Sequence, residues 1–194
     1  YKIGLCFPGL KSQNGIAVMA NGPRIPDMKN RLNKIKTIFN DSDCCVIGEW
    51  KSTIGKMQDM DNCIYIGGGT GIADGVIING QLLDLNKIKE LPRSWEINIS
   101  SNETVESCLS PAGMIEKHNE IYNTRVKTLI ELSNEKSFND IFDKAVNAFS
   151  ILINDRIRFF HNRGKIIQVV VIGHRLGQFL EDSNSKYREK FQNK

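Results

Sequence analysis

The chain has 194 residues, of which 40% are hydrophobic and 25% are charged. This composition indicates one large globular domain or two small ones, and it excludes a disordered, collagen-like or disulfide-framework protein. The net charge is +4, and charges of both signs are interspersed, so we expect no nucleic-acid partner. Residue 1 is Tyr, and residues 2–7 read as a buried strand, which predicts that the chain starts inside a fold.

The cysteines and the apolar runs indicate the cellular compartment, the metal content and whether a membrane span is expected. The sequence holds an odd number of cysteines and no C-x-x-C pair. We therefore expect small buried thiols in a reducing cytoplasm. No Cys/His cluster has the spacing of zinc ligands, so we expect no structural zinc. No run approaches 18 apolar residues, so no membrane span is expected. The cysteines are Cys6, Cys44, Cys45, Cys63 and Cys108.

The first third of the chain reads as short strands followed by helices. The apolar spacing of Met28, Leu32 and Ile35 predicts a helix that opens at residue 26. Strands are expected over 2–7 and 16–19, and a second helix is expected over 44–56.

The remainder of the chain predicts an α/β arrangement. Asn79-Gly80 is a hairpin signal, and the β-branched run over 166–172 is typical of a strand covered on both faces. An apolar stripe follows the expected helix over 138–160. The expected order is strands at 63–67, 76–78 and from 81, helices at 105–120, 122–133 and 138–160, a strand at 166–172 and a helix at 177–191. Strands followed by helices and then by a buried strand and a helix indicate α/β.

A glycine-rich segment, GGGTG over 67–71, lies between two expected strands. Glycines let backbone N–H groups approach a phosphate closely, and a Thr hydroxyl adds one more donor. The segment is neither a Walker loop, because the Gly-Lys-Ser/Thr ending is absent, nor a Rossmann fingerprint, because a strand follows it. It is therefore either a phosphate-binding turn or a tight hairpin corner.

Asp41 lies in the polar cluster that precedes the second expected helix. An Asp at a helix start can serve only as a cap, which is worth about 1 kcal/mol. A carboxylate in a cleft can instead accept the proton of a substrate hydroxyl. Glu49, further along the same helix, reads as structural.

The order of several short motifs resembles the ROK family of sugar kinases and regulators. The resemblance spans most of the chain and implies an α/β protein with the ribonuclease H-like, actin-like ATPase fold in two lobes. Residues 1–40 are then the remnant of an incomplete N-terminal lobe, and residues 41–194 form the large C-terminal lobe with nucleotide- and sugar-binding elements. The motifs are Pro8-Gly9, Asn40-Asp41 with Gly48-Glu49, Gly69-Thr70-Gly71-Ile72, Ile77-Ile78-Asn79-Gly80, Val105-Glu106 and Val171-Ile172-Gly173.

The resemblance also assigns roles to individual residues. It implies that Asp41 is the catalytic base that deprotonates the 6-hydroxyl of a hexose. It implies ATP and Mg²⁺ as cofactors, a hexose and a nucleotide as partners, and a homodimer as one assembly. The implied sugar ligands are Pro8, Gly9, Asn40 and Glu96, and the implied nucleotide ligands are Gly69, Thr70, Gly71 and Gly173.

Five departures separate this chain from the family pattern. The His of the Gly-Glu-x-Gly-His segment does not follow Glu96, and the Cys-rich zinc loop is absent. Asp74 adds a carboxylate that would repel phosphate unless it points away or meets Mg²⁺. His174-Arg175 replaces the usual second glycine after Gly173. The first phosphate loop, Asp-x-Gly-Gly-Thr, does not occur in the sequence.

His174 and Trp95 each have two interpretations, whereas the other two histidines have one. His118 and His161 are expected at the surface, on a helix and a turn. His174 either lines the nucleotide pocket or lies outside it. Trp95 either stacks on a sugar ring or packs within the protein.

These features predict a ROK-type, glucokinase-like kinase that transfers the γ-phosphate of ATP to a hexose 6-hydroxyl, present here as an incomplete chain. The phosphoryl donor is ATP or polyphosphate. The alternative is a non-catalytic sugar-sensing regulator on the same scaffold, which the lost glycine, the lost His and the absent first phosphate loop favour. A third reading is a structural lobe without activity of its own.

Overall fold

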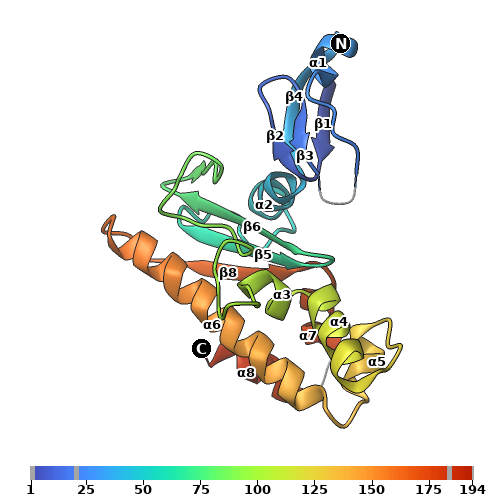
Figure 1. The fold of residues 1–194 in the computed structure, drawn as a ribbon. Coiled ribbons are helices and arrows are strands. Elements are labelled where there is room, and N and C mark those ends of the chain that lie inside the picture. The colour runs from blue at the N-terminus through green and yellow to red at the C-terminus, as the bar shows by residue number, and fades with distance from the viewer. Residues whose placement is uncertain (1–2, 20–21, 183–184, 194) are drawn as a thin grey trace. The chain divides into compact units, whose positions relative to one another are not determined.

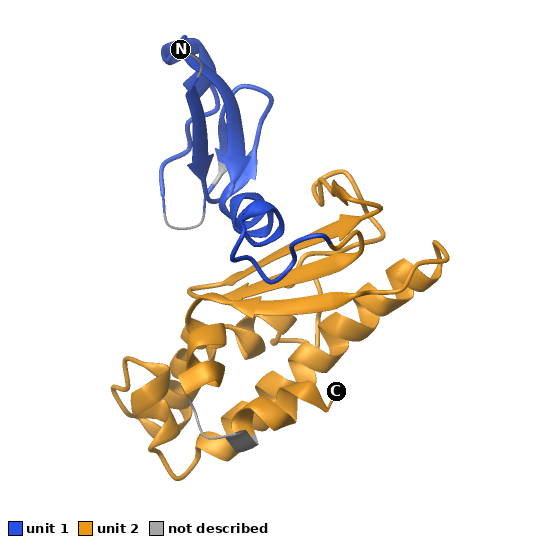
Figure 2. Ribbon diagram, turned by 180° about the vertical axis from the view of Figure 1, so that it is seen from behind, with its two compact units in different colours: residues 1–59 blue, residues 60–194 orange. Residues whose placement is uncertain are grey.

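A computed structural model describes residues 3–19, 22–182 and 185–193 (Figure 1). The chain divides into two compact units, residues 1–59 (unit 1) and residues 60–194 (unit 2) (Figure 2). Each unit has its own strands, helices and buried apolar residues, and each is described by itself.

Unit 1 is built on two strand pairs and two helices. The first pair is parallel and the second is antiparallel. Ile16, Met28 and Ile35 form its buried apolar centre. The elements are β1 (Ile3–Phe7), β2 (Leu10–Lys11), β3 (Ile16–Val18), α1 (Met28–Arg31), β4 (Ile35–Asn40) and α2 (Asp41–Lys51), with β1 paired to β4 and β2 to β3.

The expected helix from residue 26 through Ile35 is wrong in its second half. Helix α1 ends at Arg31, and Ile35 begins strand β4. Ile35, Thr37 and Ile38 are β-branched, so they lose side-chain freedom in a helix and fit a pleated strand. Pairing with β1, about thirty residues earlier, therefore overrides the helical spacing.

Helix α2 begins at Asp41, three residues before the expected start. Asn40 caps it, because its side chain accepts a hydrogen bond from the Ser42 N–H. The helix lies along β4 and β1, so contacts assign it to unit 1, and the units part at residue 59. The lobe boundary at residue 40, which the resemblance implied, differs from this division and stays a prediction.

Unit 2 contains a four-stranded sheet with the order β7-β6-β5-β8. Strand β6 is antiparallel to β5 and β7, whereas β8 is parallel to β5. The strands are β5 (Cys63–Gly68), β6 (Ile72–Ile78), β7 (Gln81–Leu82) and β8 (Val169–Gly173). The helices are α3 (Val105–Leu109), α4 (Pro111–Tyr122), α5 (Leu129–Ser133), α6 (Phe138–His161), α7 (His174–Asp182) and α8 (Ser185–Gln192).

Helices α3, α6 and α7 lie on one face of this sheet (Figure 1). Ile64 and Ile66 of β5 share a buried cluster with the apolar stripe of α6, as the period-2 strand and the helical stripe require. An aromatic cluster joins α6 to α7 and α8 through Phe138, Phe142 and Phe179. The core of unit 2 therefore lies between the sheet and the helices.

The strands expected at 63–67 and 76–78 and the helix expected over 138–160 agree with the structure except at their ends. The helix expected over 122–133 is wrong in its first half, because Asn123 ends α4 in the left-handed conformation and α5 starts only at Leu129. Ser110-Pro111 divides the helix expected over 105–120, because Ser110 ends α3 and caps α4. The helix expected over 177–191 is two helices, α7 and α8. Strand β8 starts at Val169 and is only half-buried, while Ile166 is exposed, so the strand expected over 166–172 was too long and too buried.

Asp74 is buried in unit 2 and forms ion pairs with two buried arginines. It lies at an alternate position of β6 and faces the helices together with Ile72 and Val76. Arg156 of α6 donates to Asp74 Oδ2 at 2.6 Å, and Arg93 Nη1 lies 3.6 Å from Asp74 Oδ1. The carboxylate that was expected to disturb phosphate binding is therefore turned into the core and neutralised there.

His118 is fully buried, so its expected surface position is wrong, whereas His161 is exposed as expected. His118 Nε2 lies 2.9 Å from Ser137 Oγ, and Nδ1 lies 3.0 Å from Thr124 Oγ1. Thr124 donates its only hydroxyl proton to Asn119 Oδ1, which also accepts the Val126 N–H. Thr124 Oγ1 must then accept from His118, so the neutral imidazole carries its proton on Nδ1.

We predict that replacing Arg156 with Met destabilises unit 2 by about 3–5 kcal/mol, because Asp74 keeps a buried charge without its closest partner. The free energy of unfolding is measured by urea titration with circular dichroism. Arg163→Met is the control, since the ion pair of Arg163 with Glu90 is exposed and should be worth less than about 1 kcal/mol. Equal losses in the two variants would contradict the prediction.

We predict that ¹⁵N NMR finds His118 in the Nδ1–H tautomer at neutral pH, because Thr124 can only accept from that nitrogen. The exposed His161 serves as the internal control. A His118 ring protonated on Nε2 alone would show that the hydroxyl network is arranged differently.

Candidate functional site

The carboxyl ends of β1 and β4 lie side by side in unit 1, because the two strands are parallel and Phe7 pairs with Asn40. The residues that follow each strand, Pro8-Gly9 and Asp41, therefore lie at the same edge. Asn40 Nδ2 donates a hydrogen bond to the Gly9 carbonyl at 2.9 Å. Gly9 has a φ of +88°, which a residue with a side chain rarely adopts, so the turn requires glycine.

Asn40 and Asp41 both contact the first turn of α2. Asn40 Oδ1 accepts from the Ser42 N–H at 3.2 Å and from the Ser42 hydroxyl at 3.1 Å. Asp41 Oδ1 also accepts from the Ser42 N–H, at 3.0 Å, and the residue is half-buried. The helix N-terminus stabilises a carboxylate at this place, so Asp41 can hold a negative charge beside the Pro8-Gly9 turn. A cap contact and a chemical role are compatible here.

Lys11 lies next to this cluster, and the sequence reasoning missed it. Its ammonium donates to the carbonyls of Phe7, Pro8 and Gly9. Burial lowers the pKa of Lys11, while the negative charges of Asp41 and Asp43 act in the opposite direction. No local sequence signal marks this role, because it depends on the fold of the turn.

The cysteines are free thiols in different environments rather than uniformly buried ones. Cys63 is buried and Cys6 is exposed, while the other three are intermediate. Burial and a hydrogen bond with Cys6 raise the pKa of Cys44 to about 12, and burial raises that of Cys63 to about 11. Both thiols are therefore protonated at neutral pH and are poor nucleophiles.

In unit 2, the glycine-rich segment forms the turn between β5 and β6. The Gly69 N–H donates to the Gly71 carbonyl at 2.9 Å, and Thr70 is exposed at the tip. A Cβ on Gly68 would lie 2.6 Å from the Leu176 Cβ, and one on Gly71 would lie 2.8 Å from Glu106 Oε2. These glycines are therefore required by packing, and the turn still presents backbone and the Thr70 hydroxyl to solvent.

Glu106 of α3 holds the turn in place. Its Oε2 accepts from the Ile72 N–H at 2.9 Å and from the Ser94 hydroxyl at 3.4 Å. One carboxylate thus connects the glycine turn to the loop that carries Glu96. Glu106 belongs to the Val105-Glu106 motif, to which the resemblance assigns no role. Its signal is a polar residue in the first turn of a helix capped by Thr104.

Glu96 is exposed and closes a turn. Its Oε2 accepts from the Arg93 N–H at 2.7 Å, and its own N–H donates to the Arg93 carbonyl. The neighbouring Trp95 is 42% exposed, and its ring lies 5.7 Å from the Arg93 guanidinium carbon. A half-exposed ring agrees better with a surface for stacking than with packing in the core.

Gly173 ends β8 beside Gly67 of β5, so it lies at the same sheet edge as the glycine turn. A Cβ on Gly173 would lie 2.4 Å from the Tyr65 hydroxyl, which explains the glycine. His174 follows with a φ of +58°, unusual for a residue with a side chain, and pairs with Gly68 through an isolated bridge. The structure therefore brings Gly173 and His174 to the glycine turn.

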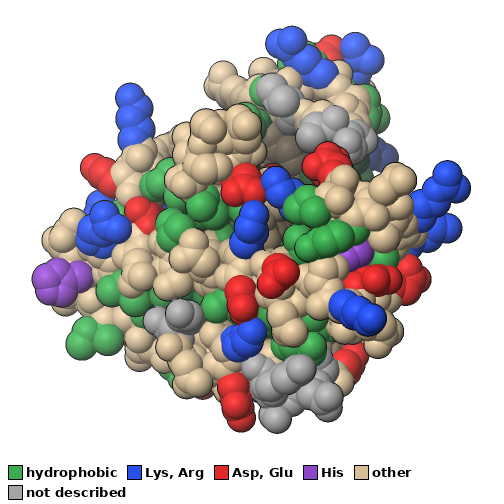
Figure 3. Space-filling view, turned by 60° about the horizontal axis from the view of Figure 1, so that its bottom comes forward, with side chains coloured by type: hydrophobic (Ala, Val, Ile, Leu, Met, Phe, Trp, Pro, Cys, Tyr) green, Lys and Arg blue, Asp and Glu red, His purple; other side chains and the backbone are tan. Residues whose placement is uncertain are grey.

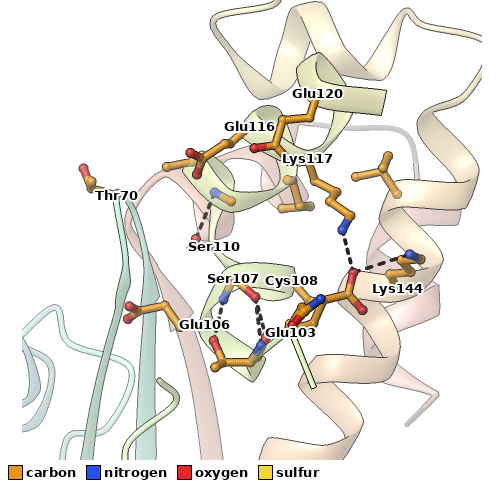
Figure 4. Close-up of a pocket in the computed structure, with 16 residues that line it drawn as sticks. Thr70, Glu103, Glu106, Ser107, Cys108, Ser110, Glu116, Lys117, Glu120 and Lys144 are labelled. Atoms are coloured by element: carbon orange, nitrogen blue, oxygen red, sulfur yellow. Dashed lines mark hydrogen bonds and ion pairs between the residues drawn. The ribbon is translucent and has the colours of Figure 1, made fainter. Parts of the chain in front are cut away.

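A pocket of about 500 Å³ opens next to Thr70 (Figure 4). It is lined by residues of α3, α4 and α6, and Glu103 lies in it between two lysines. Lys117 Nζ lies 2.9 Å from Glu103 Oε1, and Lys144 Nζ lies 3.6 Å away. These ion pairs lower the pKa of Glu103 and raise that of Lys117. The lining combines charged side chains of both signs with apolar ones such as Met114 and Ile141.

The predicted site residues thus form two groups. Pro8, Gly9, Asn40 and Asp41 come together in unit 1, while the turn 69–71 and Gly173 come together in unit 2. Glu96 connects to the turn through Ser94 and Glu106. On the face shown in Figure 3, acidic and basic side chains are interspersed.

Among residues 3–19, 22–182 and 185–193, no three His, Cys, Asp or Glu side chains gather closely enough to hold a metal ion. None of the helices in that part of the chain is long and apolar enough to cross a membrane.

Comparison with known proteins gives matches among solved structures. No family model matches the chain, and no curated protein matches it significantly by sequence. A ROK hexokinase from Thermus thermophilus superposes with a TM-score of 0.73 at 17% identity, over 99% of this chain and 67% of its own. A ROK glucokinase from Streptomyces griseus, in complex with glucose and AMPPNP, gives 0.58 at 15% identity, over 88% and 61%.

A regulator of the same family matches equally well. A ROK family transcriptional regulator, a homologue of the E. coli MLC protein, gives a TM-score of 0.74 at 14% identity, over 99% of this chain and 54% of its own. Kinases and regulators thus share the architecture seen here, and this chain spans between about half and two thirds of their lengths. The chain has the α/β, actin-like ATPase fold of the ROK sugar kinases and ROK regulators.

Proposed function

We propose that the protein is a ROK-type sugar kinase that transfers the γ-phosphate of ATP to the 6-hydroxyl of a hexose, as a glucokinase does. The observation that carries the proposal is the contact between Asn40 and the Pro8-Gly9 turn, with Asp41 at the start of α2. This contact puts the Asp41 carboxylate next to the Asn40 side chain and the Pro8-Gly9 turn, where strand β4 leads into helix α2. The likeness to structures described as ROK hexokinases and glucokinases supports it.

In this proposal Asp41 is the general base. It accepts the proton of the sugar 6-hydroxyl as that oxygen attacks the γ-phosphorus, and the helix N-terminus stabilises its charge beforehand. In unit 1, Asn40 and the Pro8-Gly9 turn are the proposed ligands of other hydroxyls, and Glu96 is the sugar ligand that the resemblance implies in unit 2. Phosphoryl transfer depends mostly on positioning and on neutralising charge, so the base must be held at a fixed place beside the hydroxyl.

The turn 69–71 binds the nucleotide phosphates in this proposal. The N–H groups of Thr70 and Gly71 and the Thr70 hydroxyl are the proposed donors, because the Gly69 N–H is used within the turn, and Gly173 lies at the same edge of the sheet. Glu106 keeps the turn in place. Its carboxylate accepts hydrogen bonds from the Ile72 N–H and the Ser94 hydroxyl instead of pointing freely into solvent. Asp74 does not oppose phosphate binding, since it pairs with Arg156 in the core. When bound, Mg²⁺ would neutralise the phosphate charge.

The second candidate is a sugar-sensing regulator. The superposition with a ROK family transcriptional regulator favours it, as does the absence of a His after Glu96. The turn glycines also have packing reasons that would hold without a nucleotide. A sensor would bind a hexose through Asn40 and Glu96 and would not turn it over.

The setting of the proposed kinase follows from its substrates and thiols. We place it in the cytoplasm, where ATP is available, and the free state of all five cysteines is compatible with a reducing compartment. A homodimer stays a prediction from the resemblance.

We predict that Asp41→Asn lowers kcat of the complete gene product by at least about 100-fold, because the general base is lost. Sugar binding, measured by calorimetry, should remain detectable, since Asn keeps the size and the cap contact. Phosphoryl transfer is measured by a coupled assay with ATP and a panel of hexoses.

Asp43→Asn is the matched control, because Asp43 lies in the same helical turn and has no proposed role in proton transfer. Equal activity of Asp41→Asn and the parent protein would contradict the assignment. A parent protein that binds a hexose without turning it over would favour the regulator.

We predict that Gly71→Ala raises the KM for ATP by about tenfold, which corresponds to ~1.4 kcal/mol. The added Cβ would lie 2.8 Å from Glu106 Oε2 and push the turn out of place. Gly48→Ala is the control, because no atom lies within 4 Å of its added Cβ and alanine favours the helix. An unchanged KM in Gly71→Ala would argue against phosphate binding by this turn.

A further inference from the structure

The Lys11 side chain ends in a small cage of backbone oxygens. Its Nζ lies 2.5 Å from the Phe7 carbonyl, 3.1 Å from that of Pro8 and 2.8 Å from that of Gly9. Three consecutive carbonyls therefore converge on one nitrogen, at the place where β1 ends and the Pro8-Gly9 turn begins.

The number of these contacts indicates the charge state of the Lys11 side chain. A carbonyl can only accept, so three carbonyl partners require three N–H donors. A neutral amine has two, whereas an ammonium has three, and the contacts are therefore those of the charged form. Burial lowers the pKa of Lys11, and the carboxylates of Asp41 and Asp43, which counteract it, lie near enough to act on the ammonium.

Such a cage is also the ligand set of a monovalent cation. Backbone carbonyls replace the hydration shell of K⁺ in ion channels, and an ammonium ion has nearly the same radius as K⁺. Lys11 supplies this charge on a tether, so the chain needs no ion from solution. The nearby carboxylates complete a negative surrounding for it.

We propose that Lys11 is a built-in monovalent cation that fixes the Pro8-Gly9 turn and thereby acts as a positioning residue for Asn40 and Asp41. The link is the Gly9 carbonyl, which accepts from Lys11 Nζ at 2.8 Å and from Asn40 Nδ2 at 2.9 Å. Without the ammonium, all three carbonyls lose this shared donor and Gly9 keeps only its bond from Asn40, so the turn that anchors Asn40 is no longer held in place. The catalytic part of this inference rests on the proposed function, whereas the structural part does not.

The test uses the complete gene product and two variants. Lys11→Ala empties the cage, so its melting temperature should fall by about 5 °C. Added KCl or NH4Cl should restore it, and tetramethylammonium chloride at the same concentration should not, because that ion is too large to enter. Lys11→Met fills the space without a charge, so it should melt lower and respond to none of the salts.

A second readout measures phosphoryl transfer. If the parent protein is a kinase, Lys11→Ala should lose about tenfold in kcat and regain it with KCl or NH4Cl, with an unchanged KM for ATP. If the parent has no kinase activity, the proposed function fails and the melting experiment still decides the role of Lys11. An unchanged melting temperature in Lys11→Ala, or a loss that neither KCl nor NH4Cl restores, would overturn the inference.

Discussion

The parallel pairing of β1 with β4 is the constraint on which the unit 1 site depends. It brings Phe7 opposite Asn40, so the turn after one strand meets the helix that starts after the other. The bond of Asn40 to the Gly9 carbonyl follows from this register, and it ties the start of α2 to the turn that Lys11 holds through local contacts. A shift of one residue would turn these side chains to the opposite face.

In unit 2, a second pair of parallel strands brings candidate site residues together in the same way. Strands β5 and β8 are parallel and end together at Gly67 and Gly173, next to the turn that leads into β6. Glycine at these places allows Tyr65 and Glu106 to pack against the backbone. A close approach of side chains thus determines the shape of a turn whose outer surface remains accessible. Packing and ligand binding are compatible explanations of the same glycines.

The sequence was informative where the cause is local. The long apolar stripe of α6, the strands around the glycine turn and the polar cap at Asn40-Asp41 all depend on neighbouring residues. It failed where a distant partner decides. Strand β4 has a helical spacing and becomes a strand because β1 pairs with it. Asp74 was expected to disturb phosphate binding and His118 to lie at the surface, and the partners that bury them, Arg156 and Ser137, lie further along the chain.

The central claim is that Asp41 takes the proton from the sugar. The most direct measurement is a crystal structure of the complete gene product with a hexose and a non-hydrolysable ATP analogue. The account predicts the 6-hydroxyl within about 2.6–3.2 Å of the Asp41 carboxylate, with the nucleotide phosphates on the turn 69–71. A bound hexose whose 6-hydroxyl lies away from Asp41, or contacts another side chain instead of Asp41, would contradict the account.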